Sequence, residues 1–109
     1  KLYSITEKGE QLLVEKLLSL LGSPEHMRWQ VDVALYNLTL LPKSKIVNAL
    51  TTYQEGLHKK IEGYNDLLQY LKDSDCPPHR FEVAKRPILL LQADLYWATS
   101  YLEGLMGEK

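Results

Sequence analysis

Two apolar stripes, separated by a short segment that contains two prolines, constrain the fold of this chain most strongly. The stretch from about Lys43 to Asp73 carries apolar residues on two seven-residue tracks, and the stretch after residue 80 carries them at steps of three and four. Seven-residue apolar spacing is typical of a helix that packs along its length against another helix. Because the intervening segment DSDCPP (residues 73–78) is short, the second helix has to run back along the first. We therefore expect an antiparallel, coiled-coil-like helical hairpin.

The expected core of this hairpin follows the stripes. On the first helix, one track is Leu50, Leu57, Tyr64 and Leu71, and the other is Ile46, Tyr53, Lys60 and Leu67, with Ile61 beside the lysine. The second helix contributes Phe81, Ala84, Ile88, Leu91, Leu95, Ala98, Leu102 and Leu105. Pro87 either kinks this second helix or marks its start after a looser turn at residues 79–85, and the residues leave both alternatives open.

Two further helices are expected before the hairpin. One runs from Glu7 to Leu21, with Thr6 as its N-cap and Gly22 just after its end. The other begins with Ser23 as N-cap and Pro24 at the first helical position, and it ends before Pro42. The apolar residues of these helices also recur at steps of three and four: Leu13, Leu17, Leu20 or Leu21 in the first, and Met27, Val31, Ala34 or Leu35, Leu38 and Leu41 in the second. The expected fold class is all-α, with four helices.

The last helix is apolar on more than one side. A second stripe consists of Leu90, Ala93, Trp97 and Tyr101, Leu89 and Tyr96 lie beside it, and only Gln92, Asp94, Thr99, Ser100 and Glu103 remain for solvent. A single antiparallel neighbour covers roughly a third of a helix surface, so a further layer has to cover the rest. The first two helices supply part of that layer. For the remainder we expect a second copy of the chain, in a two-fold homodimer with an intermolecular helical core.

Charge and composition exclude several classes of protein for this piece. The 13 basic and 14 acidic side chains give a net charge of −1 without a basic block, which is not the pattern of a nucleic-acid-binding surface. No apolar run reaches the roughly 18–20 residues that a membrane span requires. Cys76 is the only cysteine, so an internal disulfide is impossible and a cytoplasmic location is expected.

The sequence contains no recognisable catalytic or metal-binding pattern. His26, His58 and His79 lie in three separate segments, and none has another histidine or a cysteine at metal-ligand spacing. There is no glycine-rich phosphate loop and no nucleophile elbow, and Cys76 precedes two prolines in a loop with no predictable base. We expect a protein that is not an enzyme and has no cofactor.

Five aromatic residues are candidates for the binding of a small effector: Trp29, Tyr36, Tyr96, Trp97 and Tyr101. Flat apolar ligands favour aromatic walls with a few polar partners. The alternative interpretation is ordinary packing between the second and fourth helices. Gln92 and Asp94 lie among these residues in the sequence, where they either orient a ligand hydroxyl or form the exposed edge of the helix.

The N-terminal stretch LYSITEKG (residues 2–9) alternates apolar and polar residues like a strand and then leads into a helix at Thr6. Two or three residues of extended chain require a neighbouring strand, and no later segment provides one. We therefore expect that a further domain precedes Lys1.

These features resemble the PadR family of bacterial transcriptional regulators, in the branch with a long C-terminal helical domain. In that family, the pattern Tyr-x-Leu-Thr-x-x-Gly-x-x-x-Leu closes the wing of a winged helix-turn-helix; Tyr3, Ile5, Thr6, Gly9 and Leu13 match it here. The segments ALYNLTLLPKSKIVNAL, with Leu41 and Pro42, and LQADLYWATSYLEGL are similar to later parts of the family pattern. Many relatives carry a Trp-Leu pair near the end, where this chain has Tyr101 and Leu102 and places its tryptophan at position 97.

The resemblance implies that residues 1–22 are the end of a wing strand and a linker helix, and that residues 23–109 are a C-terminal domain. Such a domain dimerises, sets the separation of two DNA-binding heads and, in some members, senses a phenolic acid or hydrophobic drug. The alternative hypothesis is a purely structural helical dimerisation module that binds no ligand.

Overall fold

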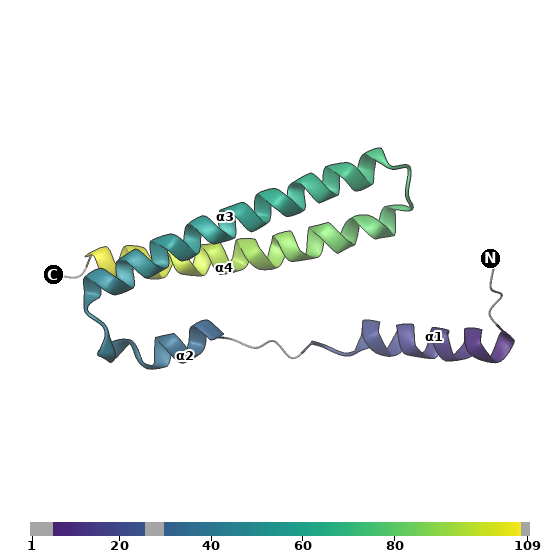
Figure 1. Ribbon diagram of the computed structural model, residues 1–109, viewed down its shortest axis with the longest axis horizontal. Coiled ribbons are helices and arrows are strands. Elements are labelled where there is room, and N and C mark those ends of the chain that lie inside the picture. The colour runs from purple at the N-terminus through teal and green to yellow at the C-terminus, as the bar shows by residue number, and fades with distance from the viewer. Residues whose placement is uncertain (1–5, 26–29, 108–109) are drawn as a thin grey trace. The chain divides into compact units, whose positions relative to one another are not determined.

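The computed structural model describes residues 6–25 and 30–107, and every regular element in these two ranges is helical. In chain order the elements are α1 (Glu7–Gly22), α2 (Gln30–Tyr36), the 3-10 helix η1 (Leu38–Leu40), α3 (Lys43–Asp73), the 3-10 helix η2 (Pro78–Phe81) and α4 (Glu82–Gly107) (Figure 1). The all-α prediction with four α-helices is confirmed. The chain divides between Tyr36 and Asn37 into two structural units, which are described separately below.

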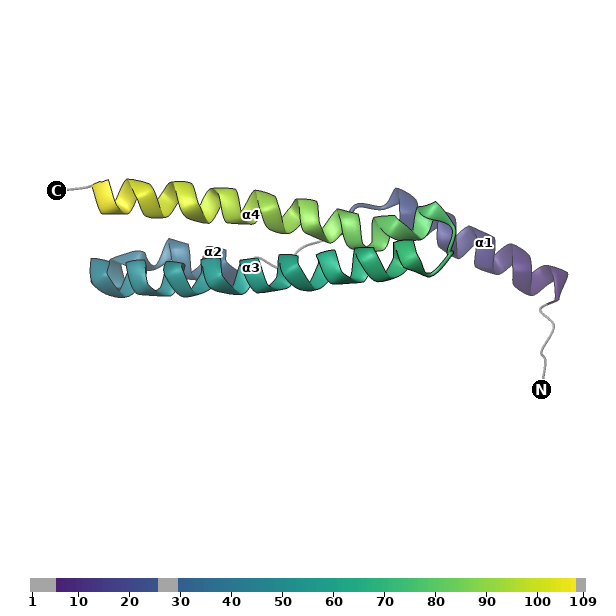
Figure 2. The same ribbon diagram turned by 90° about the horizontal axis from the view of Figure 1, so that it is seen from above.

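The second unit is an antiparallel hairpin of α3 and α4, which lie side by side and are joined at one end (Figures 1 and 2). The bounds of α3 are those predicted from the sequence. Among the described residues, the buried apolar side chains all come from these two helices: Leu50 and Leu57 from α3, and Ala84, Ile88, Ala98, Leu102 and Leu105 from α4. The two apolar stripes therefore face each other.

One cluster of the core lies at the end of the hairpin away from the loop. Leu50 packs there with Leu102 and Leu105, and Ile46, Val47, Trp97 and Tyr101 pack around them. Farther along, Tyr64 and Leu71 of the same track are half-buried, as are Leu91 and Leu95 of α4. Ala84 and Ala98 have no exposed surface, so their small side chains are fully enclosed within the hairpin.

The loop between α3 and α4 is held by local backbone conformation. Asp75 has a left-handed backbone (φ 54°), a conformation that aspartate tolerates better than most residues with a side chain. The Ser74 N–H donates to the Leu71 carbonyl at 3.3 Å, and the Cys76 thiol donates to the same carbonyl at 3.1 Å. These bonds end α3 and turn the chain toward η2.

Pro87 lies inside α4, of which it is the sixth residue. Of the two alternatives left open by the sequence, the helix therefore includes Pro87 and begins at Glu82. Because proline has no N–H, the carbonyl of Val83 lacks its usual donor four residues later. Val83 is 64% exposed, so this turn of the helix is open to water, which can replace the missing donor.

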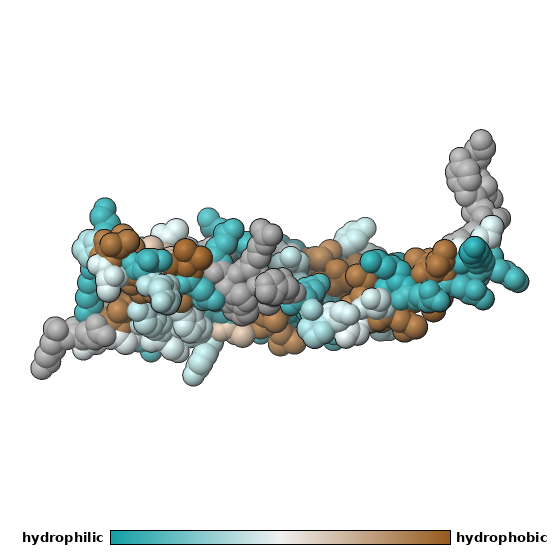
Figure 3. All heavy atoms as spheres, turned by 90° about the horizontal axis from the view of Figure 1, so that it is seen from below, coloured by the Kyte–Doolittle hydropathy of each residue, from teal (hydrophilic) through white to brown (hydrophobic). Residues whose placement is uncertain are grey.

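In the first unit, the N-terminus of α1 agrees with its predicted cap. Thr6 has an extended backbone, and its side chain accepts a hydrogen bond from the Gly9 N–H at 3.0 Å. Gly22 is the last residue of the helix, one position farther than predicted, and Ser23 follows in an extended conformation. The apolar side chains of α1 are exposed, and at the α1 end of Figure 3 they alternate with hydrophilic ones. The residues expected to form a wing strand, 2–5, lie outside the described residues.

The bounds predicted for the second helix are wrong at both ends. Ser23, Pro24 and Glu25 are not helical, and α2 covers only Gln30–Tyr36. The chain then forms η1, and Leu41 is extended (φ −117°, ψ 140°). The pyrrolidine ring of Pro42 disfavours a helical backbone at the residue before it, which explains the conformation of Leu41. The tighter 3-10 turn shows that apolar spacing alone did not determine where this helix ends.

Candidate functional site

Two hydrogen bonds between side chains link α3 to α4 on opposite flanks of the apolar seam. The Tyr53 hydroxyl donates to the Asp94 carboxylate, and the Gln54 side-chain amide donates to the Thr99 hydroxyl at 3.0 Å. Tyr53 and Gln54 are successive residues and point about 100° apart around α3, whereas Asp94 and Thr99 point about 140° apart around α4. The two bonds therefore enclose the buried seam between them.

The environment of Tyr53 keeps its hydroxyl protonated. Burial, followed by the hydrogen bond to Asp94 and the negative charge of that carboxylate, raises the pKa of Tyr53 to about 12. All three causes disfavour the tyrosinate form. The neutral hydroxyl therefore remains a donor to Asp94 over the whole physiological pH range.

Asp94 and Thr99 correct one prediction made from the sequence. Both were assigned to the solvent side of α4, yet both are half-buried and accept hydrogen bonds from α3. Gln92, which was grouped with them, is exposed. A carboxylate beside the helix seam gains a partner when a hydroxyl of the opposite helix lies within reach, and Tyr53 provides it.

Of the five aromatic candidates, the structure brings two together. The rings of Trp97 and Tyr101 are stacked, with centroids 5.8 Å apart and an interplanar angle of 7°. Both side chains are half-buried and pack against the cluster of Leu50, Leu102 and Leu105. Asp94 lies on the same helix, one turn before Trp97. This part of α4 combines an aromatic wall, a carboxylate and a neighbouring phenol.

Of the other three candidates, Tyr96 does not join this pair. Tyr96 is 76% exposed, and Tyr36, at the end of α2 in the other unit, is 90% exposed. Trp29 lies outside the described residues. The predicted pocket of five aromatic residues stays a prediction, of which the structure assembles the Trp97 and Tyr101 part.

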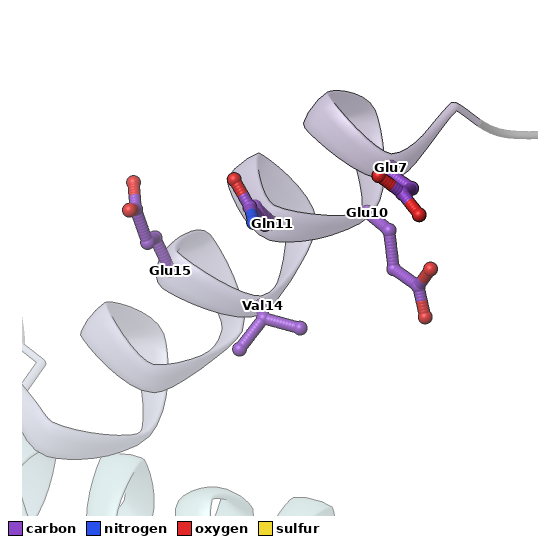
Figure 4. Close-up of a pocket in the computed structure, with 5 residues that line it drawn as sticks. All are labelled: Glu7, Glu10, Gln11, Val14 and Glu15. Atoms are coloured by element: carbon purple, nitrogen blue, oxygen red, sulfur yellow. The ribbon is translucent and has the colours of Figure 1, made fainter.

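A shallow hollow on the surface lies elsewhere, on the first turns of α1 (Figure 4). Its lining consists of Glu7, Glu10, Gln11, Val14 and Glu15, which all project from this one helix. It contains none of the residues predicted to bind an effector. A single helix surface with three carboxylates does not enclose a flat apolar molecule.

Cys76 has a structural contact that the sequence did not reveal. It is half-buried in the hairpin loop, where its thiol donates to the Leu71 carbonyl. In residues 6–25 and 30–107, no group of three or more His, Cys, Asp or Glu side chains is placed to hold a metal ion. No helix in the same ranges has both the length and the apolar character to cross a membrane.

Comparisons with known proteins do not identify a relative. No protein-family model, curated protein or solved structure matches the chain significantly. The functional interpretation therefore depends on the residues and contacts described above.

The cross-helix pairs were missed from sequence because their partners are 41 and 45 residues apart. One signal could have revealed them. In an antiparallel hairpin, residues at equal distances along the chain from the loop lie at the same level. Because the loop is centred near Asp75, Tyr53 and Gln54 of α3 lie level with the part of α4 between Asp94 and Thr99.

Proposed function

We propose that this chain is the C-terminal dimerisation and effector-sensing domain of a cytoplasmic PadR-like transcriptional regulator, which reads DNA through a winged helix-turn-helix head outside this sequence. The observation that carries the proposal is the start of α1. Thr6 and Gly9, the Thr-x-x-Gly part of the resemblance, form one capping contact in which the threonine side chain accepts from the glycine N–H. The pattern thus has a local structural role at the position where the resemblance expects a linker helix to begin.

The hairpin supports a dimerising role. Leu89, Leu90 and Tyr96 of α4 are exposed, although their side chains are apolar or aromatic. A helix with apolar residues on several sides is usually buried on several sides. In the proposed homodimer, two hairpins form an intermolecular helical core, and α1 of each copy transmits the geometry of this core to a DNA-binding head.

The effector-sensing role is supported by the arrangement of Asp94, Trp97 and Tyr101. A flat aromatic ligand can stack on the two rings, while the carboxylate or the Tyr53 hydroxyl orients a polar group of the ligand. Such a ligand alters the regulator only if it binds one separation of the heads more tightly than another.

The second candidate function is a structural dimerisation module without a ligand. It is favoured by the packing of Trp97 and Tyr101 against the Leu50 cluster, because rings that already fill a core need no ligand to cover them. In this case the hairpin would hold two heads at one fixed distance.

Fluorescence distinguishes these two functions. A Trp29→Phe variant leaves Trp97 as the only tryptophan and is titrated with a panel of phenolic acids and planar aromatic cations. Saturable quenching at micromolar concentration is expected for the effector-sensing domain. If the whole panel leaves the emission unchanged, the structural module is the better description. A Trp97→Phe variant that retains Trp29 serves as the matched control for quenching by the ligands alone.

The DNA-binding part of the proposal is tested with the product of the complete gene. An electrophoretic mobility shift with the DNA upstream of that gene is expected, together with the loss of the shift when only residues 1–109 are used. A gene product that contains no winged-helix head, or that gives no shift, would contradict the regulatory role.

A further inference from the structure

The side of α4 that faces away from α3 is apolar and symmetric about Ala93. Leu89 and Leu90 lie four and three residues before Ala93, and Tyr96 and Trp97 lie three and four residues after it. Trp97 stands at the edge of this side, because it is half-buried and also packs against the Leu50 cluster. Leu89, Leu90 and Tyr96 are 66%, 46% and 76% exposed, and the small side chain of Ala93 is exposed between them. Because large side chains flank the small side chain of Ala93 in both directions along the helix, an antiparallel second copy presents the same order of side chains to it.

We propose that two copies of the chain pack α4 against α4 in an antiparallel manner, with the two-fold axis beside Ala93. This inference rests on the dimer of the proposed function and specifies its interface. In such an isologous contact the same surface is used by both copies, so a residue n positions before the axis lies at about the level of the residue n positions after it in the other copy.

The two flanks of the surface match separately. Leu90 and Trp97 are seven residues apart and lie on one flank, while Leu89 and Tyr96, also seven apart, lie on the other. A two-fold axis perpendicular to the helices keeps each flank on its own side. Leu90 therefore meets Trp97 of the second copy, and Leu89 meets Tyr96 of the second copy. Each branched side chain thus packs against an aromatic ring.

The ends of the surface are complementary in charge. Lys85 and Glu103 are 18 residues apart, which is five turns of a helix, and both lie on the Leu89 flank. Because Lys85 lies eight residues before Ala93 and Glu103 ten residues after it, the antiparallel arrangement places Lys85 of one copy less than one helical turn from the level of Glu103 of the other. Within its own chain the Lys85 ammonium lies 3.6 Å from a Glu82 carboxylate oxygen, and both side chains are solvent-exposed, so this contact can be shared with Glu103.

The available surface corresponds to a small interface. Side chains of the size of Leu89, Leu90 and Tyr96 present on the order of 100 Å² each at these exposures. With Ala93, Trp97 and the flanking residues, the surface approaches the roughly 600 Å² per partner at the lower limit of stable interfaces. A parallel or off-centre contact would leave some of these side chains uncovered.

Disulfide trapping tests the position of the axis. Helices packed at small residues have axes roughly 8–10 Å apart, and the Cα radius is about 2.3 Å, so two Ala93 Cα atoms facing each other are about 4–5 Å apart. This separation is within the range of a disulfide. The test chain carries Cys76→Ser with Ala93→Cys, and the matched control carries Cys76→Ser with Gln92→Cys, an exposed position on the neighbouring side of α4.

After mild oxidation, non-reducing electrophoresis is expected to show the Ala93→Cys chain mostly as a covalent dimer and the Gln92→Cys chain mostly as a monomer. Circular dichroism checks that both remain helical. Sedimentation equilibrium under reducing conditions gives the oligomeric state independently. If the reduced chains are dimers but Ala93→Cys forms no more disulfide than the control, this interface is wrong while the proposed dimer stands. If the reduced chains are monomers at all concentrations, both are wrong.

Discussion

The Tyr53 hydroxyl of α3 donates a hydrogen bond to the Asp94 carboxylate of α4, across the seam of the hairpin. On the other flank, Gln54 and Thr99 form the second such bond. Most side-chain hydrogen bonds in proteins go to the backbone or to water, so two cross-helix bonds at one level of a two-helix unit are a specific feature. They fix the rotation of each helix about its own axis, which apolar contacts alone specify less strictly.

Removal of the Tyr53 hydroxyl should destabilise the hairpin. Tyr53→Phe keeps the ring and leaves Asp94 without its donor, so we expect a loss of about 0.5–1.5 kcal/mol in the free energy of unfolding. Urea denaturation followed by circular dichroism measures it. Tyr70→Phe is the matched control, because Tyr70 is on the same helix and is 67% exposed. Equal stabilities of the two variants would show that the Asp94 contact contributes nothing.

The stability of the hairpin should fall at high pH because of the same residue. The pKa of Tyr53 is raised to about 12 in the folded chain, from an ordinary value of 10.0. The contribution of the neutral hydroxyl is therefore fully present below pH 10 and is lost as the pH rises through about 12. Since Tyr53 is half-buried, the effect is smaller than for a fully buried group.

The ordinary pKa values of free lysine and tyrosine side chains fall near this pH range, so the comparison has to be made with Tyr53→Phe. Urea midpoints measured from pH 9 to pH 12 should decline more steeply for the natural chain, and the two curves should converge at the upper end. Parallel curves would mean that Tyr53 titrates alike in the folded and unfolded chains.

Enlargement of Ala98 should force the two helices of the hairpin apart. Ala98 has no exposed surface, and its methyl group lies within the interface of α3 and α4. Ala98→Leu is expected to cost about 1–3 kcal/mol of unfolding free energy, because the added atoms have no space. The control is Ala49→Leu on the exposed side of α3, for which a change within about 0.5 kcal/mol is expected. Thermal unfolding gives both values, and tolerance of leucine at position 98 would contradict the enclosure of Ala98.

Loss of the Thr6 cap should loosen the start of α1. Thr6→Ala removes the acceptor of the Gly9 N–H and should cost about 1 kcal/mol locally. Native-state hydrogen exchange measured by NMR is the suitable method, and the Gly9 amide should exchange roughly fivefold faster. Thr6→Ser retains the hydroxyl and is expected to retain the protection. Identical exchange in all three chains would mean that the cap does not hold the helix.

The sequence by itself determined the helical parts that depend on neighbouring residues. The seven-residue spacing predicted the facing stripes of the hairpin, Pro42 and the DSDCPP loop placed the ends of α3 near Lys43 and Asp73, and Thr6 marked the start of α1. It failed for the second helix, because apolar residues at helical spacing also occur in η1 and in the extended residue before Pro42. There, local backbone preferences outweighed the apolar pattern.

Only the tertiary structure decided which side chains of different helices meet. It placed Asp94 and Thr99 against α3, where the sequence had them in solvent, and it separated Tyr96 from the stacked Trp97 and Tyr101. The reason is physical. Helix formation depends on residues within one or two turns, whereas a contact between helices depends on their register and rotation, which the packing of the whole seam sets.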